Sequence, residues 1–112
     1  MKMRFTLAGT GLEGREQIIR RHCHEGIKVR LVREPKNEHD PNAIAVYLIV
    51  GILPFFRSPM MIGYVNAVRA STLHARLDAG ERPTAAYVAK CYAPPDLEFP
   101  SVSVEIQFEP MR

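Results

Sequence analysis

The sequence predicts a mainly β fold, with six short, largely antiparallel strands and two short helices, in which the sheet closes into a small barrel. Six segments alternate between apolar and polar residues or form short apolar runs bounded by turn residues. Two further segments show the spacing of a helix. The resulting order, β-α-β-β-β-α-β-β, contains no regular βαβ alternation, so a parallel sheet is not expected. At 112 residues, the chain is expected to be one domain, residues 1–112.

The first elements follow from simple patterns. Residues 3–9 alternate between apolar and polar side chains, which predicts an opening strand that ends at Gly9. After a glycine-rich turn, residues 15–23 predict a short helix. Its two isoleucines, Ile18 and Ile19, are expected to face the core, and its arginines to face mostly outward (Arg15, Arg20 and Arg21).

The middle of the chain predicts three strands. Residues 27–34 alternate cleanly and predict a half-buried strand. Residues 43–50 are apolar on both faces, which is typical of a central or curled barrel strand. Residues 51–59 are expected to form an exposed connection, and residues 60–65 a further strand.

The last elements are a helix and two strands. Residues 66–80 give the clearest helical pattern, with Asn66 as the N-terminal cap and Gly80 as the stop. Two strands separated by a proline-containing turn are expected to complete the sheet (residues 83–92 and 101–109).

Composition and charge restrict the class of protein. With 46% hydrophobic and 24% charged residues, the chain resembles an ordinary folded domain. The N-terminal apolar run is too short for a secretory signal, and residues 43–56 are too short for a membrane span. We therefore expect a cytoplasmic, nucleoid-associated protein, or a nuclear one in a eukaryote. Residues 1–33 hold eight Lys/Arg against three Asp/Glu, a net charge of +5 that modestly favours a polyanionic partner.

The sequence gives little support for an enzyme or a cofactor. "GTGLEG", residues 9–14, fits the GxGxxG dinucleotide pattern, but without a parallel βαβ unit a flexible turn is the preferred interpretation. The consecutive His22, Cys23 and His24 diverge in direction and lack a second pair of ligands, so no metal site is expected. No nucleophile and base have the spacing of a known motif. We expect a non-enzymatic chain without a cofactor.

One polar loop, "EPKNEHDPN" at residues 34–42, is longer than a hairpin requires. Pro35 and Pro41 fix φ at both of its ends. Asp40 and Asn42 are suited to hydrogen bonds with nearby backbone, so on local chemistry a self-stabilised turn is favoured over a binding loop.

A longer pattern resembles the HIRAN domain family. It comprises "LVREPKNEHDPNAIAVY", "IGYV" and "NAVRASTLHARLDAG", together with "TLAGTGLEGREQII" near the start, and it spans about residues 5–88. The resemblance implies a modified OB-like barrel with two helices. Such domains occur as stand-alone bacterial proteins and as modules of helicase-like DNA repair enzymes. They bind single-stranded DNA and, where best understood, its free 3′ end.

The resemblance also implies roles for individual residues. Asp40 matches the carboxylate that accepts the terminal 3′-hydroxyl, and His39 lies where the family often has an aromatic residue beside the end nucleotide. Asn37 matches a polar contact of the same loop, and Tyr64 lies where a residue after the strand glycine faces DNA. A carboxylate accepts from a hydroxyl and repels phosphate, so it selects a free end. Four cations are candidates for binding the phosphate backbone (Arg15, Lys28, Arg30 and Arg33).

Two functional hypotheses follow. The first is a non-enzymatic nucleic-acid-binding module for single-stranded DNA or DNA 3′ ends in repair or stalled-fork processing, with a helicase or nuclease as a further partner and no membrane contact. Family members that bind ends carry a basic residue and paired aromatics where this chain has Gly11, Leu12 and Glu13. The second is a protein-interaction or assembly domain that kept the barrel but lost the end pocket. It would self-associate through residues 52–61, where apolar side chains gather (Phe55, Phe56 and Met60).

Overall fold

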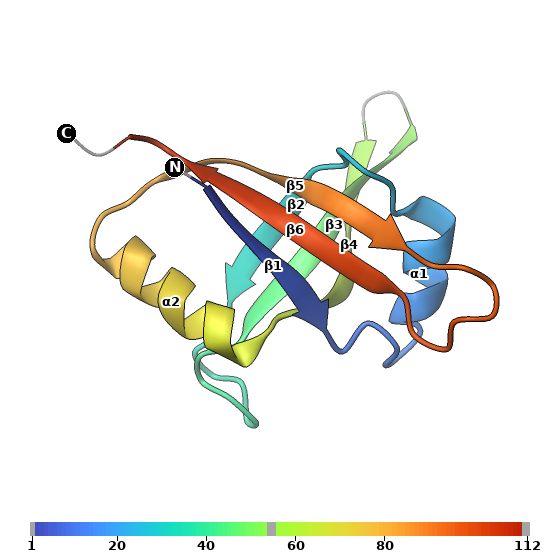
Figure 1. Ribbon diagram of the computed structural model, residues 1–112, viewed down its shortest axis with the longest axis horizontal. Helices are drawn as coiled ribbons and strands as arrows, with labels where there is room; N and C mark the ends of the chain where they lie inside the picture. The colour runs from blue at the N-terminus through green and yellow to red at the C-terminus, as the bar shows by residue number, and fades with distance from the viewer. Residues whose placement is uncertain (1, 54–55, 111–112) are drawn as a thin grey trace.

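The elements follow one another in the predicted order. The computed structural model describes residues 2–53 and 56–110, and the side chains of residues 2–51 and 56–110. Six strands and two helices are present in this part of the chain (Figure 1): β1 (Lys2–Ala8), α1 (Arg15–His22), β2 (Val29–Arg33), β3 (Ile44–Leu53), β4 (Phe56–Val65), α2 (Ala67–Asp78), β5 (Pro83–Tyr92) and β6 (Ser101–Phe108).

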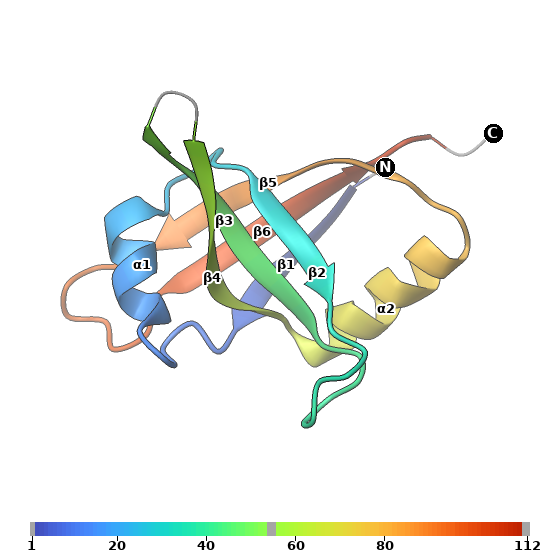
Figure 2. The ribbon, with the colours of Figure 1, turned by 180° about the vertical axis from the view of Figure 1, so that it is seen from behind.

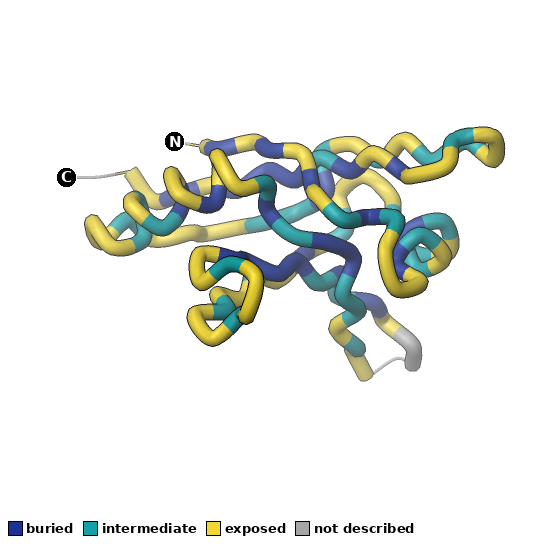
Figure 3. Tube along the Cα trace, turned by 90° about the horizontal axis from the view of Figure 1, so that it is seen from below, coloured by how far each residue is buried: buried dark blue, intermediate teal, exposed yellow. Residues whose placement is uncertain are grey.

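The strands form one antiparallel sheet in the order β2-β3-β4-β1-β6-β5. β1 joins its two halves: it pairs with β6 from Lys2 to Thr6, but with β4 only at Leu7 and Ala8. The sheet therefore folds over on itself, and the two halves lie as two layers (Figures 2 and 3). Where β4 meets β1, a Cβ on Gly63 would lie 2.7 Å from the Ala8 carbonyl oxygen, so this close approach requires glycine.

The sheet does not close into the predicted barrel. Within the described part of the chain, one isolated bridge connects the two edges of the sheet, between Lys28, just before β2, and Tyr87 of β5. Gly26 donates its backbone N–H to the Val88 carbonyl beside this bridge, at 2.8 Å. Since β2 has five residues and β5 has ten, most of β5 has no strand opposite it on that side. The prediction of a mainly β fold with six strands and two helices is correct. The prediction that the sheet closes into a barrel is wrong.

The predicted connection at residues 51–59 is also wrong. Most of it belongs to a long hairpin, because β3 continues to Leu53 and β4 begins at Phe56. Pro59 lies within β4, opposite Ile49. Proline is tolerated there because β4 pairs with β1 only from Tyr64 onward, so the missing N–H of Pro59 removes no bond to a second neighbour.

The core lies between the layers, where Figure 3 shows the buried stretches of chain. β1 contributes Met3, Phe5 and Leu7, as its alternation predicts. α1 contributes Ile19, which is fully buried, and α2 contributes Ala70 and Leu73. None of the helices in the described ranges is long and apolar enough to span a membrane.

The two cysteines are free thiols that pack against the core. Burial raises the pKa of the Cys23 thiol strongly, and the neighbouring Cys91 raises it further. Since the thiolate is the reactive form, we expect Cys23 to react with iodoacetamide at neutral pH far more slowly than free cysteine, and at the ordinary rate in denaturant. Mass spectrometry after timed alkylation measures this. Rapid modification of Cys23 in the folded chain would contradict it.

Candidate nucleic-acid interface

A cleft of about 480 Å³ opens where β1 ends, beside the loop between β2 and β3. Four parts of the chain contribute to its walls: the end of β1 with the turn after it, the start of α1, the β2–β3 loop, and the junction of β4 with α2. The lining residues are Ala8, Gly9, Leu12, Glu13, Arg15, Asn37, His39, Asp40, Ala43, Tyr64, Val65 and Ala67.

The β2–β3 loop is held by its own side chains. Asn37 Oδ1 accepts the backbone N–H groups of His39 and Asp40, at 2.9 and 3.1 Å. Asp40 Oδ1 accepts the backbone N–H of Asn42 at 2.8 Å. The expected self-stabilising turn is therefore present at Asp40. A carboxylate has a second oxygen, and each oxygen has two lone pairs, so this bond fixes the orientation of Asp40 without exhausting its capacity to accept.

Glu34 links the loop to β4. Its Oε1 accepts from Asn37 Nδ2 at 2.9 Å and from the Tyr64 hydroxyl at 3.0 Å. Burial, followed by the hydrogen bond to Glu34, raises the pKa of Tyr64 above its ordinary value. Tyr64 therefore stays protonated as a donor at neutral pH. Sequence reasoning gave Glu34 no role, because only the fold brings β4 beside the loop.

Arg15 was expected to point outward but is buried, with 8% of its surface exposed. Its Nη1 donates to the Gly9 carbonyl at 2.9 Å, and its Nη2 contacts the Glu13 carboxylate at 3.2 Å. The guanidinium also lies over the Tyr64 ring, 5.3 Å from the ring centre. These contacts bring a positive charge into the cleft wall and pair it with the acid of the turn after β1.

The chain matches a known family in sequence and a solved structure in fold. A family model described as HIRAN domain matches residues 2–109. This chain belongs to the HIRAN family. The HIRAN domain of human HLTF, a solved structure, is similar to it with a TM-score of 0.60 and 18% sequence identity, over 96% of this chain and 74% of the other. At that identity, the likeness shows a shared fold. No curated protein matches the chain.

HIRAN domains are in general DNA-binding modules and not catalytic domains. Within residues 2–53 and 56–110, no three His, Cys, Asp or Glu side chains lie close enough together to hold a metal ion. The family therefore makes the cleft of this HIRAN domain a candidate DNA-binding site.

The remaining predicted cations lie away from the cleft. Lys28 and Arg30 are exposed just before and within β2. Arg33 pairs with Asp78 at the end of α2, with Nη1 and Oδ1 3.0 Å apart. Of the eight residues predicted to bind nucleic acid, five line the cleft (Arg15, Asn37, His39, Asp40 and Tyr64) and three do not (Lys28, Arg30 and Arg33).

An aromatic residue that the sequence did not indicate lies beside the cleft. A Cβ placed on Gly11 would lie 1.9 Å from a ring carbon of Phe99, so the ring packs directly against the Gly11 backbone. Phe99 is nevertheless 54% exposed. Together with residues 9–12 it lines a smaller hollow of about 260 Å³, which shares Gly9 and Leu12 with the cleft. Residues 11–13 contain no aromatic residue, but the ring of Phe99, from a loop distant in sequence, lies next to them.

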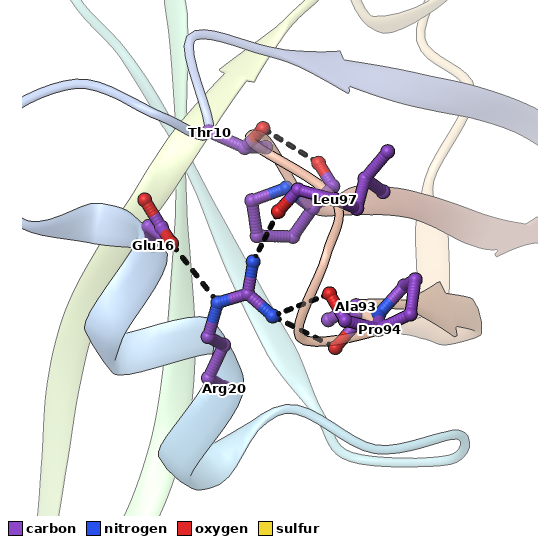
Figure 4. A network of polar contacts seen from close by, with 7 residues as sticks. Thr10, Glu16, Arg20, Ala93, Pro94 and Leu97 are labelled. Carbon is purple, nitrogen blue, oxygen red and sulfur yellow. Dashed lines mark hydrogen bonds and ion pairs between the residues drawn. The ribbon is translucent and has the colours of Figure 1, made fainter.

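The β5–β6 loop, residues 93–100, is fixed at both ends (Figure 4). Arg20 of α1 donates from Nη1 to the carbonyls of Ala93 and Pro94, at 2.8 and 2.9 Å, and from Nη2 to the carbonyl of Leu97. Glu16 accepts from Arg20 Nε at 3.0 Å and orients the guanidinium. At the other end, the buried Thr10 hydroxyl donates to the Pro100 carbonyl at 2.7 Å.

Arg20→Lys is expected to loosen this loop, because an ammonium group cannot reproduce a planar fork that serves three carbonyls. We expect a loss of about 1–2 kcal/mol in the free energy of unfolding, and faster amide hydrogen exchange at residues 96–99. Arg21→Lys, on the exposed side of the same helix, is the matched control. Unchanged exchange in Arg20→Lys would contradict the role given to Arg20.

Proposed function

We propose that this HIRAN domain is a non-enzymatic module that binds single-stranded DNA by its 3′ end in the cleft. One observation carries the proposal: residues from three segments far apart in the sequence line the same cleft (Arg15; Asn37, His39 and Asp40; Tyr64). They provide an acceptor, a ring and a cation, which are the groups that a nucleotide with a free 3′-hydroxyl requires.

Asp40 supplies the selectivity. Its carboxylate, oriented by Asn42, accepts the hydrogen bond of a terminal 3′-hydroxyl. A phosphate in the same place brings a second negative charge close to the carboxylate, and this repulsion is strong at short range. His39 is exposed beside Asp40 and offers a ring to the end nucleotide. Arg15, which also pairs with Glu13, places a guanidinium in the cleft wall toward the phosphate that precedes it.

The biological setting is also a proposal. A module that binds ends without catalysis can deliver or retain an enzyme at a DNA end. We infer a helicase or nuclease as that partner, in repair or in the processing of stalled forks, in the compartment that holds the chromosome.

The test is fluorescence anisotropy on one single-stranded sequence prepared with a 3′-hydroxyl or a 3′-phosphate. We expect the hydroxyl end to bind about tenfold more tightly or better, the value of one hydrogen bond to a charged group. The same pair of chemistries at the 5′ end is the control and should not change the affinity. Equal binding to both 3′ ends would contradict the proposal.

Self-association is the second candidate function, because Phe56 is 66% exposed in the β3–β4 hairpin. The rest of the predicted apolar surface supports it less. Met60 packs against the core, and Phe55 lies outside the described residues. Light scattering at several protein concentrations without DNA tests it: a mass that rises with concentration favours assembly, and a constant monomer mass rules it out.

A further inference from the structure

A second surface, outside the cleft, is formed by β1, β6 and β5. In β1, buried side chains alternate with exposed ones, and the exposed ones include three polar residues, Lys2, Arg4 and Thr6. Because successive residues of a strand point to opposite faces, these three lie on the face directed away from the core. In Figure 1 the three strands lie in front, and among the described residues α1 and α2 lie to either side rather than across them. This outer face is open to a ligand.

The register arranges the outward side chains of this face in rows. In one row, Ser103 of β6 lies between Thr6 of β1 and Lys90 of β5. In the next row, Ser101 of β6 lies opposite Tyr92 of β5. Lys90, Tyr92 and the two serines line a hollow of about 330 Å³. Tyr92 is 56% exposed, although it is a large aromatic residue. The hollow thus combines an exposed ring, a cation and two hydroxyl groups.

The charge of the outer face is positive. Lys2, Arg4 and Lys90 are exposed on it, and one carboxylate of its strands, Glu105, is buried. Glu105 accepts from the Tyr87 hydroxyl and pairs with Arg4 at 3.5 Å. The pKa of Glu105 is lowered from its ordinary value, mainly because its carboxylate accepts the hydrogen bond from Tyr87. Because the surface is hydroxyl-rich and cationic rather than apolar, it complements a polyanion better than an apolar protein partner.

This face is continuous with the cleft. Ala8, two residues after Thr6 on the same side of β1, lines the cleft. Phe99, two residues before Ser101, lines the adjoining hollow. From β1 to the hollow at β6 and β5 is two strand spacings, about 10 Å. A strand whose end occupies the cleft therefore reaches Tyr92 and Lys90 without leaving the surface.

We propose that the outer face of β1, β6 and β5 binds the single-stranded segment on the 5′ side of the end nucleotide. Tyr92 stacks on a base, Lys90 contacts a phosphate, and the hydroxyls of Ser101 and Ser103 donate to the backbone. An exposed ring beside a cation on a sheet is a recurring way to bind single strands without reading their sequence. The direction of the strand rests on the proposed function, since the 3′ end in the cleft sends the 5′ side from β1 toward β5.

The experiment compares Lys90→Glu with Arg30→Glu, the same charge reversal on the exposed part of β2 in the other layer. Anisotropy is measured on oligonucleotides from a dinucleotide to about ten nucleotides, each with a 3′-hydroxyl or a 3′-phosphate. For the unmodified chain we expect affinity to rise with length. Lys90→Glu should weaken the longest oligonucleotide about tenfold and leave the dinucleotide nearly unchanged, whereas Arg30→Glu should change all lengths by one small factor. Tyr92→Ala should follow Lys90→Glu.

The outcomes separate this inference from the proposed function. If the 3′-hydroxyl preference is present but Lys90→Glu and Arg30→Glu behave alike at every length, the outer face is not the path of the strand. If affinity does not depend on length, the inference is equally overturned. If the two 3′ ends bind equally while Lys90→Glu removes the length dependence, the cleft proposal fails and the outer face remains a binding surface.

Discussion

Asp40→Asn is expected to remove most of the preference for a 3′-hydroxyl over a 3′-phosphate. Asparagine retains an Oδ1 that can accept the Asn42 N–H, so the loop keeps its shape. The negative charge is lost, which weakens the bond to the hydroxyl and relieves the repulsion of phosphate. We expect the ratio of the two dissociation constants to fall about tenfold, through weaker binding of the hydroxyl end and tighter binding of the phosphate end.

The matched control for this variant is Asp78→Asn. It removes the same charge from the end of α2, where Asp78 pairs with Arg33 away from the cleft. This control should change the affinity for both ends alike and leave their ratio intact. If the ratio is the same in Asp40→Asn as in the unmodified chain, Asp40 does not contact the end.

Phe99→Ala is expected to weaken binding of single-stranded DNA by about 1–3 kcal/mol, the usual value of one base stacked on an aromatic side chain. The Phe99 ring can stack on a base because it is 54% exposed and is held in place by packing against the Gly11 backbone. The 3′-hydroxyl preference should persist, since we propose that it depends on Asp40. Anisotropy with both 3′ ends measures the two quantities together.

Two further variants identify the cause of such a loss. Phe99→Leu retains bulk without an aromatic face, so it should lose nearly as much affinity as Phe99→Ala. Phe56→Ala removes an aromatic side chain that is more exposed than Phe99, from the β3–β4 hairpin, and should have little effect. Equal losses in Phe99→Ala and Phe56→Ala would show that Phe99 has no special role.

The parts of the fold that the sequence predicted correctly are those that depend on residues close together in the chain. The alternation of residues 3–9 gave β1 and its buried face, and Asn66 does cap α2, with its side chain accepting the Arg69 N–H at 3.1 Å. Two features were not predictable in this way. The length of the β3–β4 hairpin depends on where β1 stops pairing with β4, and closure depends on how far β2 and β5 meet. Both are decided by contacts between distant segments.

The candidate site likewise contains residues that the sequence could indicate and residues that only the fold brings together. Asp40, His39 and Asn37 are close in sequence, so a pattern of residues in one loop could indicate them together. Phe99 and Glu34 contact residues at or beside the cleft that lie 88 and 30 positions away in the chain, Gly11 and Tyr64. Four cations were candidates for binding the phosphate backbone (Arg15, Lys28, Arg30 and Arg33), but the sequence does not show where a side chain points. Only Arg15 of these four lines the cleft. Self-stabilisation of the loop is compatible with binding by it, because Asp40 uses only Oδ1 for the turn.

The most direct measurement of the central claim is a titration of the amide NMR signals of this HIRAN domain with a short single strand that ends in a 3′-hydroxyl. We expect the largest shifts at His39, Asp40 and Tyr64, around the cleft, and much smaller shifts of the same signals with a strand that ends in a 3′-phosphate. Shifts confined to β2 or to the β3–β4 hairpin, with the cleft signals unmoved by either strand, would contradict it.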